Sequence, residues 1–197
     1  MNNFWNERYS ATEYAYGEVP NDFIRQQLPR IKPGKILFPA EGEGRNSVFA
    51  ATLGWDVTAF DPSIEGRKKA LSLAIKHNTK IQYLVSDFNT ASFENDYFDC
   101  ICLTYAHMPS TMREQVHNKL STFLKPGGKL ILEGFSKDQI KRNSGGPKNI
   151  DMLFDDKELE NDFCNFNSLH IEKTEVILNE GPYHQGIASV IRLIGVK

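Results

Sequence analysis

The segment Lys35–Asp61, with the sequence KILFPAEGEGRNSVFAATLGWDVTAFD, limits the possible folds of this chain more than any other part. An apolar run leads into a Gly-x-Gly turn, which is followed by an amphipathic stretch and a second apolar run that ends on an acid. This order predicts a strand, a helix that begins near Gly44, and a second strand. Asp61 follows Gly42 by 19 positions, close to the roughly 20 that separate such a turn from a ribose-binding acid. The segment therefore predicts a nucleoside pocket.

Strands and helices alternate along the part of the chain that follows residue 35. The sequence predicts strands over 35–40, 56–61, 81–86, 98–105 and 129–135, with helices over 44–53, 63–77 and 110–123 between them. Such alternation gives right-handed crossovers and a parallel sheet. Two more strands, over 168–179 and 187–196, have only a short connection between them, which forces them to run antiparallel. The prediction is an α/β, Rossmann-like, doubly wound and mostly parallel sheet of seven strands that ends in an antiparallel β-hairpin.

The length of 197 residues suits one domain over 1–197. We divide it into an N-terminal segment over 1–30, a nucleoside-binding core over 35–135, and a final part over 136–197. Asn21 is a candidate N-cap for a helix over about 22–29, and Ser63 for the helix over 63–77. Pro126-Gly127-Gly128 predicts a turn, and a short helix is expected over 155–163. The polar loop over 136–150 contains Gly145-Gly146-Pro147, which suits either a lid or a plain flexible loop.

Composition excludes several classes of protein. The net charge is −2, so no basic excess is present to neutralise nucleic-acid phosphates. No apolar run approaches the roughly 18 residues of a membrane span. Three cysteines do not make a disulfide framework, and the apolar surroundings of Cys100 and Cys102 favour buried thiols over a metal pair. We therefore expect a cytoplasmic protein that binds neither nucleic acid nor membrane and holds no metal, with no oligomeric state set by the sequence.

The charges beside the glycine turn restrict the ligand. Glu41 and Glu43 flank Gly42, and two carboxylates there would repel a pyrophosphate but would tolerate an ammonium or sulfonium group. This pattern favours an amino-acid nucleoside over a dinucleotide. Asp61 is a candidate acceptor for two ribose hydroxyls, with helix capping before Pro62-Ser63 as the alternative. The alternative for the glycines is tight packing of strand against helix.

Further candidates follow the third and fourth strands. Asp87 could accept from the exocyclic amine of adenine while Phe88 packs on its ring, although an Asp at a strand end is also a common turn residue. Thr104 and Tyr105 end the fourth strand, where a reacting group would lie. His107 is a candidate general base or substrate contact, and His184 lies in the terminal hairpin turn. An ordinary surface position is the alternative for both histidines.

Together these segments resemble the class I S-adenosylmethionine-dependent methyltransferases, over nearly the whole chain. The family's acidic-x-Gly-x-Gly-x-Gly turn is represented by Ala40–Asn46, with the acid displaced by one position and Asn46 in place of the third glycine. The residues Leu124–Gly128 match the turn before the family's fifth strand. A narrower resemblance, to the tellurite-resistance-type branch related to thiopurine methyltransferases, rests on the motifs Trp5–Tyr9, Tyr14–Gly17, Pro20-Asn21, AEGEGRN, GGP and EGPYHQG.

The resemblance implies S-adenosyl-L-methionine as the cofactor and a fold member whose N-terminal segment covers it. It implies that Arg8 lies near the carboxylate of the cofactor and Tyr16 near its sulfonium end, whereas simple aromatic packing is the alternative. The candidate cofactor-binding residues are Arg8, Tyr16, Glu41, Gly42, Gly44, Asp61, Pro62, Ser63, Asp87, Phe88 and Thr104. The candidate catalytic residues are Tyr105, His107 and His184.

The expected activity is methyl transfer to a small-molecule acceptor such as a thiol or a selenium or tellurium oxyanion. A soft nucleophile of that kind would need little base catalysis. One alternative is a NAD(P)-dependent reductase, because Gly42-x-Gly44-x-x-Ser47 approaches the dinucleotide fingerprint. The two glutamates, Asp87-Phe88 and the terminal hairpin argue against it. The other alternative is a non-catalytic member of the fold that binds the nucleoside as a sensor.

Overall fold

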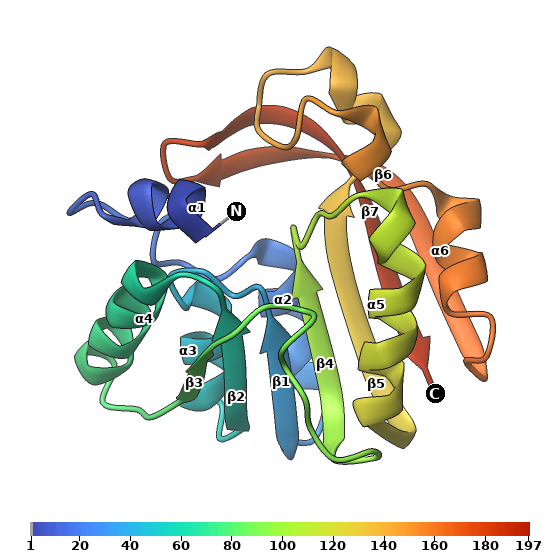
Figure 1. Cartoon of the computed structure of the whole chain (residues 1–197), viewed down its shortest axis with the longest axis horizontal. Coiled ribbons are helices and arrows are strands. Elements are labelled where there is room, and N and C mark those ends of the chain that lie inside the picture. The colour runs from blue at the N-terminus through green and yellow to red at the C-terminus, as the bar shows by residue number, and fades with distance from the viewer. Residues whose placement is uncertain (1) are drawn as a thin grey trace. The chain divides into compact units, whose positions relative to one another are not determined.

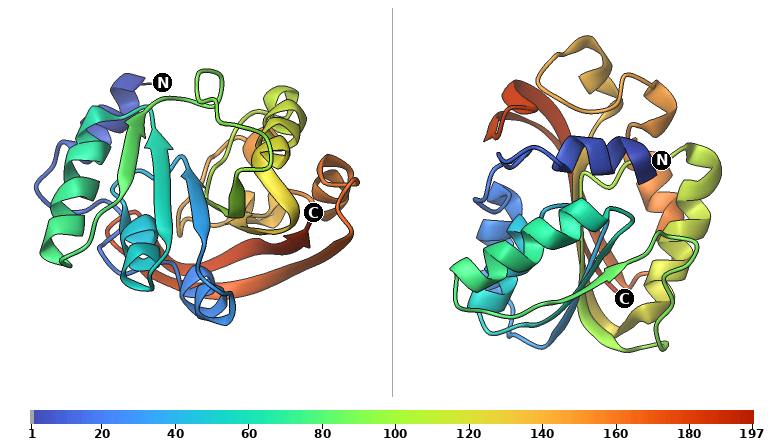
Figure 2. Two further views of the ribbon diagram at one scale, coloured as in Figure 1. Left: turned by 90° about the horizontal axis from the view of Figure 1, so that it is seen from below. Right: turned by 60° about the vertical axis from the view of Figure 1, so that its left-hand side comes forward.

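The computed structural model describes residues 2–197, without the side chains of residues 2 and 3 (Figures 1 and 2). Its strands form one mixed sheet in the order β3-β2-β1-β4-β5-β7-β6. They are β1 (Lys35–Pro39), β2 (Asp56–Asp61), β3 (Gln82–Val85), β4 (Phe98–Thr104), β5 (Leu124–Phe135), β6 (Ser168–Glu180) and β7 (His184–Val196). The predicted α/β fold with a seven-stranded, mostly parallel sheet and two antiparallel C-terminal strands is confirmed.

The chain divides into two compact units, each described below by itself. The first unit runs to Ser92 and also contains Glu180–Pro182, and the second contains Phe93–Asn179 and Tyr183–Lys197. The prediction of one domain over 1–197 stays a prediction.

The first unit contains three parallel strands, two helices that connect them, and the helices of the N-terminal segment. β1 pairs with β2, which in turn pairs with β3, with Leu37 opposite Thr58 and Phe60 opposite Leu84. The helices are α1 (Asn2–Tyr9), α2 (Asp22–Gln27), the 3-10 turn η1 (Leu28–Arg30), α3 (Arg45–Thr52) and α4 (Ile64–Lys76). Helix α4 lies against β2 and β3 and beside α1 (Figures 1 and 2).

Local chemistry explains where these helices begin. The Asn21 side chain accepts from the backbone N–H groups of Phe23 and Ile24, and the Ser63 hydroxyl accepts from that of Gly66. Both predicted N-caps are therefore confirmed. Helix α1 lacks a clear apolar stripe, so its sequence gave no helical signal. Trp5 stacks on Tyr9 with 5.4 Å between ring centroids, which ties two successive turns of α1 together.

The second unit contains parallel and antiparallel pairs. β4 runs parallel to β5, with Cys102 opposite Ile131, and β5 runs antiparallel to β7, with Leu132 opposite Leu193. The helices are α5 (Ser110–Phe123) and α6 (Asp156–Asp162), with 3-10 turns η2 (Lys137–Lys141) and η3 (Ile150–Met152) in the segment predicted as a loop. Cys100 and Cys102 are buried free thiols, as predicted.

The predicted turn at Pro126–Gly128 is instead an irregular part of β5. The Gly127 N–H donates to the Lys197 carbonyl and the Lys197 N–H donates to the Gly128 carbonyl, so pairing with the chain end continues through this segment. The register against β4 shifts between Phe98 and Cys100. Pairing partners distant in the sequence thus extend a strand past residues whose local preference is a turn.

Two wider features complete the fold. No helix in residues 2–197 combines the length and apolar character needed to cross a membrane. Within the same described range, no group of three or more His, Cys, Asp or Glu side chains has the arrangement of a metal site.

Candidate functional site

The glycine turn between β1 and α3, here named the cofactor turn (residues 40–44), depends on close packing. A Cβ on Gly42 would lie 2.6 Å from the Tyr9 hydroxyl. A Cβ on Gly44, whose φ is +89°, would lie 2.5 Å from the Cβ of Ala70 and 2.8 Å from its Cα. Ala40 also has a left-handed backbone, with φ +52°. Only glycine therefore fits at positions 42 and 44 without displacing a neighbour. The left-handed backbone of Ala40 costs about 1–2 kcal/mol.

Glu41 caps helix α3 rather than standing free beside the turn. Its Oε1 accepts from the backbone N–H groups of Asn46 and Ser47, at 3.0 and 2.7 Å. Burial raises the pKa of this carboxyl to about 7, although the bonds from Ser47 and Asn46 lower it. Glu41 as a cofactor contact stays a prediction, because one of its oxygens already serves the helix start.

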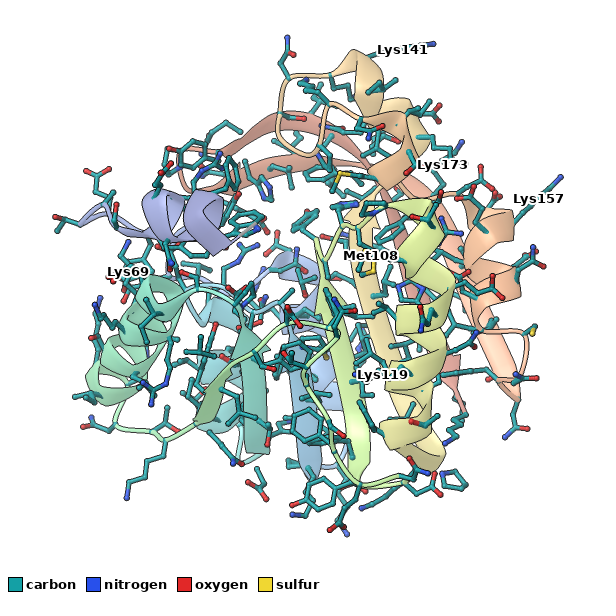
Figure 3. The ribbon with its side chains drawn as sticks, in the orientation of Figure 1. Lys69, Met108, Lys119, Lys141, Lys157 and Lys173 are labelled. Atoms are coloured by element: carbon teal, nitrogen blue, oxygen red, sulfur yellow. The ribbon has the colours of Figure 1, made fainter. Side chains whose placement is uncertain are left out.

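Glu43 is neutralised by a lysine that the sequence argument overlooked. Lys69, labelled in Figure 3, approaches Glu43 Oε1 to 2.7 Å. The other oxygen accepts from the Ala15 N–H at 2.7 Å. Glu43 therefore attaches the N-terminal segment to the turn, and the expectation that its charge selects a cationic ligand stays a prediction.

Asp61, at the end of β2, has the geometry expected of a ribose acceptor. The residue is 4% exposed, and its two oxygens accept from the backbone N–H groups of Gly42 at 3.1 Å and Ser63 at 2.8 Å. A carboxylate has about four lone-pair directions, so these bonds leave capacity for two hydroxyls. Burial raises the pKa of Asp61 to about 6, partly offset by those two bonds. These acceptor oxygens would suit the ribose hydroxyls of an adenosyl cofactor, and that role stays a prediction.

Two tyrosines that the sequence analysis did not single out surround the turn. The Tyr83 hydroxyl donates to the Gly42 carbonyl at 2.5 Å. Tyr9 lies beside Gly42 and Gly66. Burial raises the pKa of both phenols well above the ordinary value, so both remain neutral donors. Tyr9 and Tyr83 contact the turn from α1 and β3. Tyr9 ends the motif Trp5–Tyr9, whereas Tyr83 lies in none of the motifs noted above.

The N-terminal segment joins three of the predicted residues. The Ser63 hydroxyl donates to Asn6 Oδ1 at 2.7 Å, which attaches α1 to the start of α4. Arg8 donates to the Tyr16 hydroxyl at 3.1 Å. Arg8, Tyr16 and Ser63 thus take part in the contacts that place the N-terminal segment within the first unit.

Asp87 and Phe88 follow β3 in a tight turn. Asp87 Oδ1 accepts from the N–H groups of Asn89 and Thr90, both at 2.9 Å. Phe88 packs edge-to-face on Phe60, with centroids 5.7 Å apart. The turn role that the sequence left open for Asp87 is therefore present, and its contact with adenine stays a prediction.

In the second unit, the end of β4 carries a strained aromatic residue. Tyr105 has φ +53°, and its hydroxyl donates to Glu133 Oε1 at 3.0 Å. Glu133 Oε2 accepts from Arg192 at 2.6 Å. Thr104 precedes Tyr105, and its buried hydroxyl has no hydrogen-bond partner among the residues that the structure covers. An orphaned hydroxyl of this kind is an available donor for a ligand.

His107 has both ring nitrogens engaged. Its Nδ1 lies 2.8 Å from the Met152 carbonyl, and its Nε2 accepts from the Phe135 N–H at 3.0 Å. The first contact therefore requires a proton on Nδ1, which fixes the neutral tautomer. Burial lowers the pKa to about 4. These bonds leave no nitrogen to take a proton from a substrate, which disfavours the predicted role as a general base.

His184 lies in an aromatic cluster of the second unit. Its ring contacts Tyr105 and Phe135 edge-on, at centroid distances of 4.6 and 5.2 Å. A Cβ on Gly145 would lie 2.6 Å from the His184 ring, so this loop packs directly on the imidazole. Gln139 donates to the Gly145 carbonyl and to the Ser144 hydroxyl, which holds the loop in place.

Parts of this chain are similar to known proteins. Residues 36–128 match the family described as a methyltransferase domain. The chain is 28% identical over 142 residues to "Probable S-adenosyl-L-methionine-dependent methyltransferase TehB" of Haemophilus influenzae, covering 68% of this chain and 47% of that protein. It is 33% identical over 79 residues to the ubiquinone/menaquinone biosynthesis C-methyltransferase UbiE of Pectobacterium atrosepticum, covering 40% of this chain and 31% of the relative.

The fold agrees with these relatives. The crystal structure of TehB from Haemophilus influenzae superposes with a TM-score of 0.72 at 18% identity, covering all of this chain and 66% of that one. The chain spans less than half the length of the two curated relatives. The chain is thus similar to a methyltransferase domain over residues 36–128, and it shares its fold with TehB.

Proposed function

We propose that this chain binds S-adenosyl-L-methionine through its first unit and transfers the methyl group to a small-molecule acceptor. The observation that carries the proposal is Asp61, a buried carboxylate with two backbone donors and remaining capacity for two hydroxyls. Similarity to a methyltransferase domain and to a protein named as a probable S-adenosyl-L-methionine-dependent methyltransferase supports the cofactor and the class of reaction. The size and chemistry of the acceptor are our proposal alone.

The residues of the first unit would bind and orient the cofactor, which supplies a methyl group already activated by its sulfonium. Asp61 would accept from the ribose hydroxyls, and Gly42 and Gly44 would let the backbone approach closely. Arg8 would face the carboxylate, and Asp87 with Phe88 would hold the adenine. Positioning of this kind can contribute roughly 7–11 kcal/mol to a transfer between two bound groups. Exclusion of water by the N-terminal segment would assist, because charge is lost at sulfur during transfer.

In the second unit, Tyr105 and His184 would contact the acceptor, and Thr104 would contact the cofactor through its buried hydroxyl. His107 would position the surrounding backbone, since both its nitrogens are bonded. This leaves His184 as the histidine candidate for a general base. A thiol or a selenium or tellurium oxyanion needs little base catalysis, and similarity to a protein named TehB supports testing those acceptors first. The cytoplasmic location expected from the sequence is part of this proposal.

Isothermal titration tests the cofactor step. We expect wild-type protein to bind S-adenosylmethionine and S-adenosylhomocysteine at micromolar concentration and not to bind NADH. The Asp61→Ala variant should bind S-adenosylhomocysteine at least tenfold more weakly, because two hydroxyls lose their acceptor. Asp56→Ala is the matched control, since Asp56 begins the same strand and pairs only loosely with Lys35 at 3.4 Å on the surface.

Each outcome has a defined meaning. An unchanged dissociation constant for Asp61→Ala would remove Asp61 from the ribose role. NADH binding without adenosyl-ligand binding would move the reductase alternative to the front. Binding of S-adenosylmethionine without methyl transfer to thiols, selenite or tellurite would contradict the proposed acceptors, and would favour a nucleoside-binding member of the fold.

A further inference from the structure

Three motifs that are distant in the sequence meet in one buried network of the first unit. They are Asn21, the pair Arg45-Asn46 directly after the cofactor turn, and Glu180, which begins the segment Glu180–Pro182, here named the hairpin tip. Each of them belongs to a motif that resembles one branch of the family. The cofactor-binding roles proposed above use none of these four residues.

The carboxylate of Glu180 is the centre of this network. Arg45 approaches Glu180 Oε2 to 2.9 Å, with the two side chains only 8% and 13% exposed. Asn21 donates to the other oxygen, Oε1, at 3.1 Å. Arg45 also donates to the Tyr16 carbonyl at 3.3 Å, and Asn46 Oδ1 accepts from the Asn21 N–H at 2.9 Å. These contacts therefore use both oxygens of Glu180 and both residues that follow the turn, Arg45 and Asn46.

The backbone of the hairpin tip packs against the N-terminal segment as closely as glycine allows. A Cβ on Gly181 would lie 2.5 Å from the Ala15 carbonyl oxygen and 2.6 Å from the Gly17 nitrogen. Any side chain at residue 181 would separate the two segments. The tip therefore contacts the same stretch of chain that Arg45 holds through the Tyr16 carbonyl.

The network is joined directly to the cofactor turn. Arg45 is the first residue of α3 and follows Gly44, and the Asn46 N–H donates to Glu41 within the turn. Tyr16, whose carbonyl Arg45 holds, bonds Arg8 through its hydroxyl. A movement of the turn would therefore shift the partners of both the hairpin tip and the N-terminal segment. Opening the hairpin tip would separate Glu180 from Arg45, and opening the N-terminal segment would separate Asn21 from Glu180.

We propose that Arg45, Asn21 and Glu180 form a latch that holds the N-terminal segment and the hairpin tip on the cofactor turn, so that both segments close together when the turn binds ligand. These are positioning residues, since they act through the turn and the two segments. The inference rests on the cofactor binding proposed above. A buried ion pair is a weak source of stability compared with apolar packing, and specifying one closed arrangement is a role for which such pairs are suited.

Hydrogen exchange with S-adenosylhomocysteine as the probe tests the latch without any mutation. Peptides covering residues 14–21 and 176–186 of wild-type protein should both exchange at least fivefold more slowly when the probe is bound. Protection of residues 14–21 alone, or of neither peptide while the probe is bound, would overturn the latch. Failure of wild-type protein to bind the probe at all would instead overturn the cofactor proposal, so the two failures are distinguishable.

Variants extend the test. Glu180→Gln keeps the shape of the side chain and an acceptor for Asn21 but removes the charge. This variant should lose the probe-dependent protection of residues 176–186. It should also bind the probe about three- to tenfold more weakly. Arg45→Met should do the same, and the double variant should be no weaker than either single one, because both remove one interaction. Arg25→Met is the control, since Arg25 forms an exposed pair with Asp22 in the same unit. Additive losses, or protection equal to that of the control, would contradict the latch.

Discussion

Burial acts on both units of this chain, but with opposite effects on their titratable groups. In the first unit it raises the pKa of Glu41 to about 7 and that of Asp61 to about 6. In the second unit it lowers the pKa of His107 to about 4 and also lowers that of His117. Ionised carboxylates in the first unit are thus held at a cost near neutral pH, whereas the His107 imidazole of the second unit is neutral and has both nitrogens hydrogen-bonded. Hydroxyl donors of a ligand would lower the cost of keeping these carboxylates ionised.

One of the two backbone donors to Asp61, the Gly42 N–H, belongs to the cofactor turn, and damage to that turn gives the largest expected effect. We predict that Gly44→Ala lowers the free energy of unfolding by more than about 3 kcal/mol, because the new Cβ overlaps Ala70 and the backbone is left-handed. Gly54 has the same φ of +89°, and a Cβ there meets no atom of the described residues within 4 Å. Gly54→Ala should therefore cost only about 1 kcal/mol.

Urea denaturation of the two variants measures this difference. Similar losses for Gly44→Ala and Gly54→Ala would mean that backbone conformation alone, and not the approach of α3 to α4, sets the need for glycine in the turn. Close packing of the turn on α4 would then no longer distinguish the first unit from the second.

The sequence predicted the framework of both units well, because local patterns determine it. The α5 boundaries at 110–123, the β2 boundaries at 56–61 and the Ser63 cap all agree with the structure. Periodicity and capping chemistry act within a few residues, so they are visible in one sequence.

The side-chain environment of the site could not be predicted in the same way. Lys69 neutralises Glu43 from 26 positions away, and Met152 engages His107 from 45 positions away. Such partners depend on how the elements pack, which no local pattern records. The glycine turn and strand-end acid were found because their spacing is fixed by one strand–helix–strand unit.

The second prediction uses pH to separate the two units. For His107, whose folded pKa lies below the unfolded 6.5, stability is lost as pH falls below about 6.5, because the unfolded chain takes up the proton first. For Asp61 and Glu41, whose folded pKa values are raised, stability increases as pH falls through about 7 to 6. The two contributions oppose each other in the wild type.

Removing the imidazole should therefore reveal the carboxyl contribution. We expect His107→Gln, whose amide retains a donor and an acceptor, to gain about 2 kcal/mol relative to wild type between pH 7 and pH 5. Denaturation at both pH values measures the change, and His170→Gln in the exposed part of β6 is the control. A parallel pH dependence of variant and wild type would show that His107 takes up protons equally in the folded and unfolded chain.

The smallest expected effect concerns two strained residues that follow strands at equivalent places in the two units. Ala40 follows β1 with φ +52°, and Tyr105 follows β4 with φ +53°. Tyr105 offsets its strain with a hydroxyl bonded to Glu133 and a ring stacked on Phe135 at 4.6 Å. Alanine has only a methyl group with which to do so. Ala40→Gly should therefore raise the free energy of unfolding by about 1 kcal/mol, whereas Tyr105→Gly should lower it.

Thermal denaturation and titration with S-adenosylhomocysteine together decide what the strain at Ala40 does. Strained residues persist at functional sites when their conformation serves binding. If Ala40 fixes the turn so that the Gly42 N–H meets Asp61, the glycine variant should be more stable and yet bind the ligand a few-fold more weakly, because a freer turn must be ordered on binding. A gain in stability with unchanged affinity would mean that the strain is incidental. In that case ligand affinity in the first unit depends on the Asp61 carboxylate and not on the strained backbone at Ala40.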